Sequence, residues 1–155
     1  MPGKFGGYMG RVVLYDLSTQ TVTEYPWTDE DRELFIGGKI MAAKILCDCL
    51  TGSETAFSEE NPVVISTGPL TGTGAPSSSR FNMSTLSPQT GFIASSNCGG
   101  RFGYYLKKAG IDALVLKGKC ENPSWLEIDN GNLTLHDADS LWGLTTGKAQ
   151  EELRR

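Results

Sequence analysis

The nine residues Ser95-Ser96-Asn97-Cys98-Gly99-Gly100-Arg101-Phe102-Gly103 (SSNCGGRFG) lie between an apolar run, residues 91–94, and a segment of helical character, residues 104–109. Small residues at such a junction permit close packing, because glycine lets another backbone come near. The same turn could hold an anion, because the first N–H groups of a helix lack partners within the helix. The residues alone leave both interpretations open.

The surrounding sequence mixes hairpins and helices without a regular alternation of strand and helix. Two hairpins are predicted, one from strands 11–17 and 21–25 and one from strands 125–128 and 133–136 around the turn Asp129-Asn130-Gly131-Asn132. Single strands are predicted at 62–66, 80–86, 91–95 and 113–117. Helices are predicted from Thr28 through residues 34–36, at 40–50, from 104 to a stop at Gly110, and at 145–155. This order predicts an α+β fold in a single domain, residues 1–155, rather than a doubly wound sheet.

The charge of the chain argues against a nucleic-acid binder. Fourteen Lys and Arg stand against 18 Asp and Glu, for a net charge of −4, whereas such binders usually present a basic face. The two adjacent basic pairs, Lys107-Lys108 and Arg154-Arg155, are interpreted as solvated helix faces.

Cysteine spacing and hydropathy lead us to expect a soluble protein of a reducing, cytoplasmic compartment. Cys47, Cys49, Cys98 and Cys120 form no C-x-x-C pair and have no neighbouring histidine, so a self-contained zinc or iron–sulfur site is not expected. The N-terminus has no apolar signal region, and no run approaches the roughly 18 apolar residues of a membrane span. We therefore expect no membrane partner.

Familiar catalytic sets are poorly supported by the residues present. His136 is the one histidine and falls on a predicted hairpin strand, where a surface role is expected rather than general-base catalysis. The pairs Glu59-Glu60 and Glu151-Glu152 are interpreted as exposed charges. The run Gly72-Thr73-Gly74 is not a dinucleotide fingerprint, because it leads to Pro76 and three serines rather than to a helix.

Arg80 strengthens the case for an anion site. It follows a run of small residues that begins at Thr67, and it is the first residue of a predicted strand. The planar, permanently charged guanidinium of arginine suits phosphate groups. An arginine on such a loop could reach a ligand held by SSNCGGRFG, although a surface arginine that shields a strand edge fits the residues equally well.

Several blocks in a fixed order carry a resemblance to a known family. They are Gly10–Thr19 (GRVVLYDLST), Thr67–Pro76 (TGPLTGTGAP), Ser79–Asn82 (SRFN), Ser87–Phe92 (SPQTGF), Asn97–Gly103 (NCGGRFG), Leu106–Lys119 (LKKAGIDALVLKGK) and Asp137–Gly143 (DADSLWG). With these blocks the chain resembles the N-terminal domain of the tungsten-containing aldehyde ferredoxin oxidoreductase family. The blocks cover nearly the whole chain, which makes the resemblance far more specific than one glycine motif.

The resemblance implies an enzyme that oxidises aldehydes to carboxylic acids. Electrons would pass from a tungsten, or molybdenum, held by two pterins through a [4Fe–4S] cluster to ferredoxin or another electron-transfer protein. It implies that Arg80 contacts the pterin near the cluster, that Asn97 offers its main-chain carbonyl to a magnesium ion, and that Gly99 contacts the cofactor through its backbone. Magnesium prefers oxygen ligands and phosphates, which agrees with a carbonyl ligand. No catalytic residue is implied within this chain.

The departures from the family pattern are as informative as the matches. The cluster cysteines of the family lie in later domains, and nothing here has their spacing. We therefore expect a domain truncated at its C-terminal end, inactive alone, that works with the remaining domains of the same enzyme, and a homodimer is compatible with this. Two alternatives stay open: a related enzyme that reduces aromatic-ring thioesters, and a stand-alone, non-catalytic module that binds a phosphate-bearing ligand.

Overall fold

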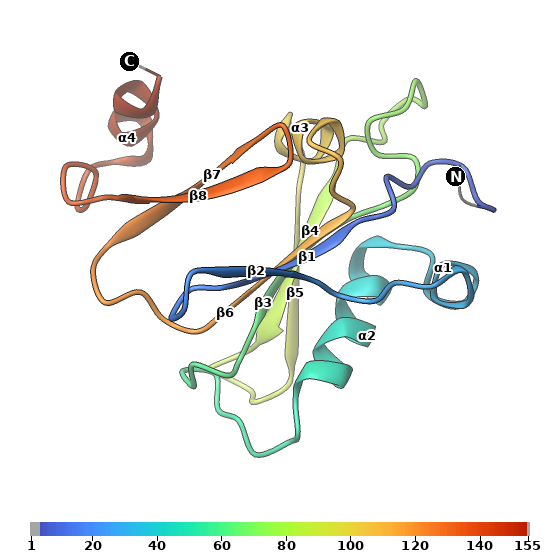
Figure 1. Ribbon diagram of the computed structural model, residues 1–155, viewed down its shortest axis with the longest axis horizontal. Coiled ribbons are helices and arrows are strands. Elements are labelled where there is room, and N and C mark those ends of the chain that lie inside the picture. The colour runs from blue at the N-terminus through green and yellow to red at the C-terminus, as the bar shows by residue number, and fades with distance from the viewer. Residues whose placement is uncertain (1–3, 155) are drawn as a thin grey trace.

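A six-stranded sheet forms the centre of the molecule in a computed structural model that describes residues 4–154 (Figure 1). Its strand order is β2-β1-β6-β3-β4-β5, and β7 and β8 form a separate two-stranded hairpin. The strands are β1 (Val12–Asp16), β2 (Thr21–Glu24), β3 (Val63–Thr67), β4 (Phe81–Leu86), β5 (Ile93–Cys98), β6 (Ala113–Lys117), β7 (Ser124–Asp129) and β8 (Asn132–Asp137). The helices are α1 (Asp29–Phe35), α2 (Gly38–Cys49), α3 (Phe102–Lys108) and α4 (Thr146–Leu153).

The predicted α+β class is confirmed by the sheet topology. Strands β1 and β6 pair in parallel, whereas the other neighbouring strands pair antiparallel. Helices cluster between hairpins instead of alternating with strands along the chain. A parallel pair needs a long crossover connection, so β1 meets β6 only after most of the chain has intervened.

Each face of the sheet has its own apolar core. Helix α2 covers one face and buries Met41, Ala42, Ile45 and Leu46, a spacing that places all four on one side of a helix. They pack against a row of small and β-branched side chains on the sheet: Val12, Val64, Ala113 and Val115. The opposite face carries Val13, Tyr15, Ile65 and Leu114, which are covered by Leu106 of α3 and by the β7–β8 hairpin.

Local sequence signals explain where several elements begin and end. Thr28 caps α1: its hydroxyl accepts a hydrogen bond from the Asp31 N–H, and the Asp31 carboxylate accepts one from the Thr28 N–H. Asn130 and Gly131 both have positive φ, as the tight turn between β7 and β8 requires. Gly110, with φ +82°, follows the last turn of α3, as predicted from its position.

The quoted stretch does not begin as a turn. Strand β5 runs over Ile93–Cys98, so Ser95 to Cys98 are paired with β4, whereas a strand over 91–95 was expected. The turn before β5 is responsible, because Gly91 has φ +71° and the Ser87 N–H donates to the Phe92 carbonyl. This closure places residue 91 in the turn and moves the strand toward the glycines.

No helix among residues 4–154 has the length and apolar character required to span a membrane.

Candidate functional site

The small-residue loop between β3 and β4 is folded around one threonine. Thr71 is buried, and its hydroxyl accepts from the Gly68 N–H (3.2 Å) and donates to the Arg80 carbonyl (3.1 Å). Its own N–H donates to the Gly68 carbonyl. The two ends of the loop are thereby joined, and Arg80 is held at a fixed point above the start of β4.

A cavity of about 460 Å³ lies beneath this loop. Its polar lining comes from Ser66 on β3, Asn82 on β4, Asn97 on β5 and Arg80, and its apolar lining includes Ile36 and Leu70. The sheet face that α2 covers with apolar contacts at β1, β6 and β3 therefore becomes polar at β4 and β5. A polar floor, apolar walls and one cation suit an organic molecule that carries an anionic group.

The Arg80 side chain has no partner inside the part of the chain that the structure describes. It is exposed, and its guanidinium makes no hydrogen bond or ion pair with residues 4–154. Its forked donors at the edge of the cavity therefore remain available for a ligand.

Asn97 lies opposite Asn82 in the β4–β5 ladder. Asn82 is only 2% exposed, and its Nδ2 donates to Ser95 Oγ (2.7 Å), the Ser96 carbonyl (3.1 Å) and Asn97 Oδ1 (3.2 Å). The Ser84 hydroxyl in turn donates to Asn82 Oδ1 (2.7 Å). This buried network fixes the Asn97 side chain from below.

The main chain of Asn97 is directed away from β4. In an antiparallel ladder, successive residues alternate between hydrogen-bonded and non-hydrogen-bonded pairs. The bond from the Ser87 N–H to the Phe92 carbonyl starts this alternation, and it makes the Asn82–Asn97 pair a non-hydrogen-bonded one. Since β5 is the last strand of the sheet, the Asn97 carbonyl faces the open edge.

The three glycines of the quoted stretch have different roles. Gly103 is buried, and a Cβ there would meet the Ser79 carbonyl and the Thr71 methyl at 3.2 Å, so it serves packing of α3 on the loop. Gly100 has φ +91° and makes the turn. Gly99 is exposed, and a Cβ there would meet nothing within 4 Å. Internal packing therefore explains Gly103 and leaves Gly99 open to an outside partner.

The cavity brings together two of the three sequence-predicted site residues. Arg80 and Asn97 both line it, whereas Gly99 lies two residues beyond Asn97, past the end of β5, and is not part of its wall. A larger polar groove of about 640 Å³ near His136 is a weaker candidate for a functional site. His136 there pairs with Glu127 (2.9 Å) and stacks on Trp125, and no group of three or more metal-ligating side chains occurs among residues 4–154.

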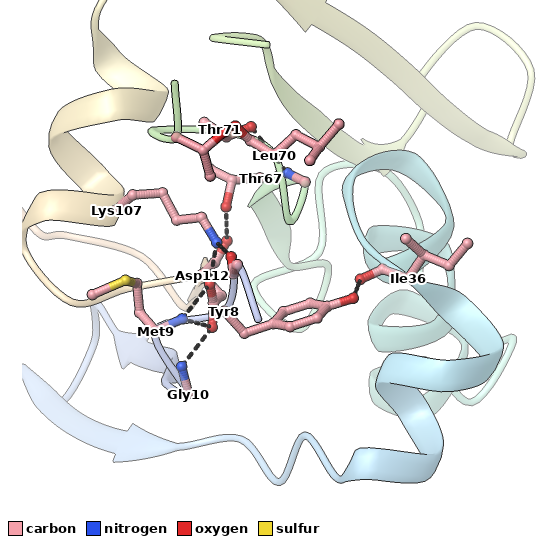
Figure 2. Close-up of polar contacts among 12 residues, drawn as sticks. Tyr8, Met9, Gly10, Ile36, Thr67, Leu70, Thr71, Lys107 and Asp112 are labelled. Carbon is pink, nitrogen blue, oxygen red and sulfur yellow. Dashed lines mark hydrogen bonds and ion pairs between the residues drawn. The ribbon is translucent and has the colours of Figure 1, made fainter. Parts of the chain in front are cut away.

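A buried ion pair was missed by the sequence analysis. Lys107, interpreted as a solvated residue, is 4% exposed, and its Nζ lies 2.5 Å from Asp112 Oδ1 and donates to the Gly7 carbonyl at 2.6 Å (Figure 2). The interpretation was wrong because Gly7 and Asp112, from two other segments, supply partners that hold the Lys107 ammonium inside the protein. Lys108 and Arg154 are exposed as expected, and Arg155 lies outside the described residues.

Asp112 is the centre of that buried cluster. It is 1% exposed, and its carboxylate accepts from the Met9 N–H (2.9 Å) and the Gly10 N–H (2.7 Å) as well as from Lys107. Its carbonyl accepts from the Thr67 hydroxyl and N–H. The N-terminal segment, α3 and the start of the cavity loop are thus tied to one carboxylate, as Figure 2 shows. The only sign of this cluster in the sequence was the position of Asp112 directly before a predicted buried strand.

The fold itself is shared with a solved oxidoreductase. The chain superposes on one chain of the active site complex BamBC of benzoyl coenzyme A reductase, in complex with 1,5-dienoyl-CoA, with a TM-score of 0.92 and 33% identity; the match covers 96% of this chain and 23% of that one.

Comparison with known sequences identifies the family. Residues 12–155 match the aldehyde ferredoxin oxidoreductase N-terminal domain. Over 96% of its length the chain is 36% identical to the tungsten-containing aldehyde ferredoxin oxidoreductase of Pyrococcus furiosus and 35% identical to that of Pyrococcus abyssi. It is 30% identical, over 88% of its length, to the aliphatic sulfonate oxidoreductase WOR-like subunit of Pyrococcus furiosus. The chain belongs to the aldehyde ferredoxin oxidoreductase family, as its N-terminal domain, and spans about a quarter of the length of these relatives.

Proposed function

We propose that this chain is the cofactor-binding N-terminal domain of a tungsten, or molybdenum, bis-pterin oxidoreductase. The enzyme would oxidise aldehydes to carboxylic acids and pass electrons through a [4Fe–4S] cluster to ferredoxin. The observation that supports this most is the cavity under the β3–β4 loop. There an unpartnered Arg80 guanidinium and the strand that carries Asn97 meet an apolar wall.

The residues present fit such a cofactor. The cavity has room for part of a ring system, and Arg80 supplies a cation with forked donors for a phosphate group. The Asn97 carbonyl, at the open edge of the sheet, is an oxygen ligand of the kind that magnesium prefers. Gly99 has no neighbour that a close-lying cofactor would displace. When bound, the metal and its pterins supply the redox chemistry.

This chain's own contribution would be to bind and orient. Arg80 would neutralise negative charge, and the buried Asn82 network would keep β5 in register so that Asn97 and Gly99 present their backbone at a fixed place. The cluster ligands, the substrate contacts and the electron partner would come from the remainder of the enzyme, since the relatives are about four times longer. The chain alone would show no turnover with aldehyde and viologen dye. The intact mass of the native gene product tests this: a mass near 16.7 kDa would instead favour a split enzyme or a binding module.

Two substitutions in the complete protein test the site. Arg80→Ala removes the unpartnered guanidinium. Gly99→Val adds a side chain at the point where the Gly99 backbone is proposed to contact the cofactor. Both should lower tungsten and pterin content per protein, measured by elemental analysis and by fluorescence of the released, oxidised pterin.

Matched controls separate this effect from general damage. Arg154→Ala also removes an exposed arginine, and Gly147→Val also adds a side chain in open space. Gly147 lies on α4 and Arg154 directly follows that helix, and neither residue lines the cavity. These controls should keep full content. Full tungsten and pterin in both Arg80→Ala and Gly99→Val would show that the proposal is wrong.

A second reaction is favoured by two of the relatives. One is named for benzoyl coenzyme A reductase and another for aliphatic sulfonate oxidation, and both resemble this chain over most of its length. The same platform would then serve a different substrate. Assays of the complete protein with aliphatic and aromatic aldehydes, with an aromatic coenzyme A thioester and with an aliphatic sulfonate distinguish these reactions by which substrate exchanges electrons with the dye.

A further inference from the structure

Ile36 has a backbone conformation that is rare for its residue type. It connects α1 to α2 with φ 54° and ψ −76°. A β-branched residue at positive φ is an outlier, and this combination lies near a γ-turn geometry that is known to be strained. Such strain persists only where the surroundings enforce it, and it concentrates at functional sites.

Two hydrogen bonds enforce the conformation of Ile36. Its N–H donates to the Arg32 carbonyl at 3.2 Å, and its carbonyl accepts from the Tyr8 hydroxyl at 2.6 Å (Figure 2). The next residue, Gly37, packs closely on the start of the cavity loop, since a Cβ there would lie 2.8 Å from the Thr67 carbonyl. The turn is therefore fixed from the N-terminal segment and from the cavity loop.

Tyr8 is itself held firmly. Two cations lie near its ring, with Arg32 Cζ and Lys107 Nζ each 5.6 Å from the ring centroid. The residues on either side of it are tied to the buried cluster, because the Gly7 carbonyl accepts from Lys107 and the Met9 N–H donates to Asp112. Burial raises the pKa of the Tyr8 phenol, with a smaller contribution from Asp112, so the hydroxyl remains a hydrogen-bond donor at neutral pH.

The strain does not serve burial of the Ile36 side chain. That side chain is 54% exposed and lines the cavity that also contains Arg80 and Asn97. Leu70, 60% exposed, lines the same cavity from the loop. Together with Pro69 and Pro76, these two large apolar side chains offer a flat molecule a surface for its ring face.

We propose that Ile36 is a ligand-contacting residue against which a ring face of the bound organic cofactor packs, and that Tyr8 is the positioning residue that holds it there. The inference rests on the proposed function and adds to it a specific contact and the device that maintains it. Arg80 would bind the anionic end of the ligand, and Ile36 would bind the apolar face.

The variant Ile36→Gly in the complete protein distinguishes the effect of backbone strain on stability from the effect of the side chain on cofactor binding. Glycine accepts positive φ, so the apo protein, produced without tungstate, should melt about 2–4 °C higher than wild type. The holo protein should nevertheless retain roughly threefold less tungsten and pterin, because the apolar contact is gone. Ile36→Val is the matched control: it keeps the branch and most of the surface, and should leave both quantities near wild type.

Tyr8→Phe tests the positioning role. Removing the hydroxyl keeps the ring beside Arg32 and Lys107 but frees the Ile36 carbonyl. It should lower cofactor content in the wild-type background and have no further effect in Ile36→Gly, where nothing is left to position. A purely structural role for Tyr8 would give the same loss in both backgrounds.

The outcomes distinguish this inference from the proposed function. If Arg80→Ala loses tungsten and pterin but Ile36→Gly keeps full content, the cofactor site stands and the Ile36 contact is wrong. If wild type carries no tungsten or pterin under conditions that load a known relative, the proposed function itself fails. A loss of content in Ile36→Val as large as in Ile36→Gly would also overturn the contact, because the lost surface is small.

Discussion

The structure contains two polar clusters, and they differ in where their partners come from. In the buried cluster, the Lys107 ammonium and the Asp112 carboxylate meet each other and the backbone of the N-terminal segment. The open cluster consists of Arg80 and Asn97 at the cavity and of Gly99 just beyond the cavity wall. They leave a guanidinium, a carbonyl at the sheet edge and an open backbone without partners in the described chain. A closed cluster stabilises the fold, whereas an open one is arranged for something outside it.

The largest expected effect is at the closed cluster. Asp112→Ala leaves the Lys107 charge buried and unpaired and removes the acceptor of two backbone N–H groups. The free energy of unfolding should fall by about 3–5 kcal/mol, measured by guanidinium denaturation. Asp139→Ala, at an exposed position, is the control and should change it by less than about 0.5 kcal/mol. A similarly small loss for Asp112→Ala would remove the basis of the comparison.

A smaller loss of stability is expected when alanine replaces Gly37, but not when it replaces Gly99, although both glycines have ordinary φ values. Gly37→Ala places a Cβ 2.8 Å from the Thr67 carbonyl and 3.1 Å from Gly68 Cα, and backbone atoms cannot easily move. This should cost about 1–3 kcal/mol in thermal or chemical unfolding. Gly99→Ala meets nothing within 4 Å and should leave stability unchanged. Equal effects at the two positions would mean that the cavity edge is as closely packed as the interior.

An intermediate effect on stability is expected at Glu54, a carboxylate at the surface that accepts several hydrogen bonds. The hydroxyl and N–H of Thr51, with help from the Gly52 N–H, hold the pKa of Glu54 at about 2. Because the folded pKa lies below the unfolded value of about 4.3, its stabilisation is present above that value and is lost as the pH falls toward 2. Glu54→Gln should therefore melt below wild type at neutral pH, with a difference that shrinks between about pH 4.3 and 2.

The control for that series is Glu60→Gln, whose carboxylate is exposed and makes no hydrogen bond or ion pair within residues 4–154. Its melting temperature at neutral pH should stay near that of wild type, because the substitution removes no hydrogen bond or ion pair. A pH-independent difference for Glu54→Gln would mean that the Thr51 contacts do not persist in solution.

The smallest effect is expected at the open cluster. Arg80→Ala removes no hydrogen bond or ion pair from the described chain, so the unfolding free energy of the cofactor-free protein should change by less than about 0.5 kcal/mol. The measurement is the same guanidinium titration used for Asp112→Ala. A loss above about 1 kcal/mol would place Arg80 with the structural residues.

The sequence predicted the elements whose cause is local. The turn Asn130-Gly131 and the helix stop at Gly110 depend on residues that accept positive φ, and both are present as expected. The Thr28 helix start depends on a side chain three residues from its partner. The blocks shared with the family pointed to Arg80 and Asn97 as site residues. The fold brings both to one cavity, and their binding role stays a prediction.

The features that were missed depend on distant partners. Lys107 was placed on the surface because an adjacent pair of lysines is usually solvated, and its burial follows from Asp112 and Gly7 in other segments. Strand β5 was placed too early because its start depends on how the preceding turn closes. The backbone conformation of Ile36 could not be predicted from the sequence. A β-branched residue disfavours positive φ, and the Tyr8 hydroxyl that helps to hold it there lies 28 residues away.

The contact between Asp112 and the N-terminal segment has a consequence for synthesis. Met9 and its carboxylate partner are 103 residues apart, and strand β1 has its parallel neighbour equally late in the chain. At translation rates of about 5–20 residues per second, the first hairpin waits roughly 5–20 s on the ribosome before its partner strand emerges. During that interval, one edge of β1 is open to any other extended segment. Early chaperone occupancy of the first 25 residues would therefore govern the yield of folded protein when the gene is expressed in a foreign host.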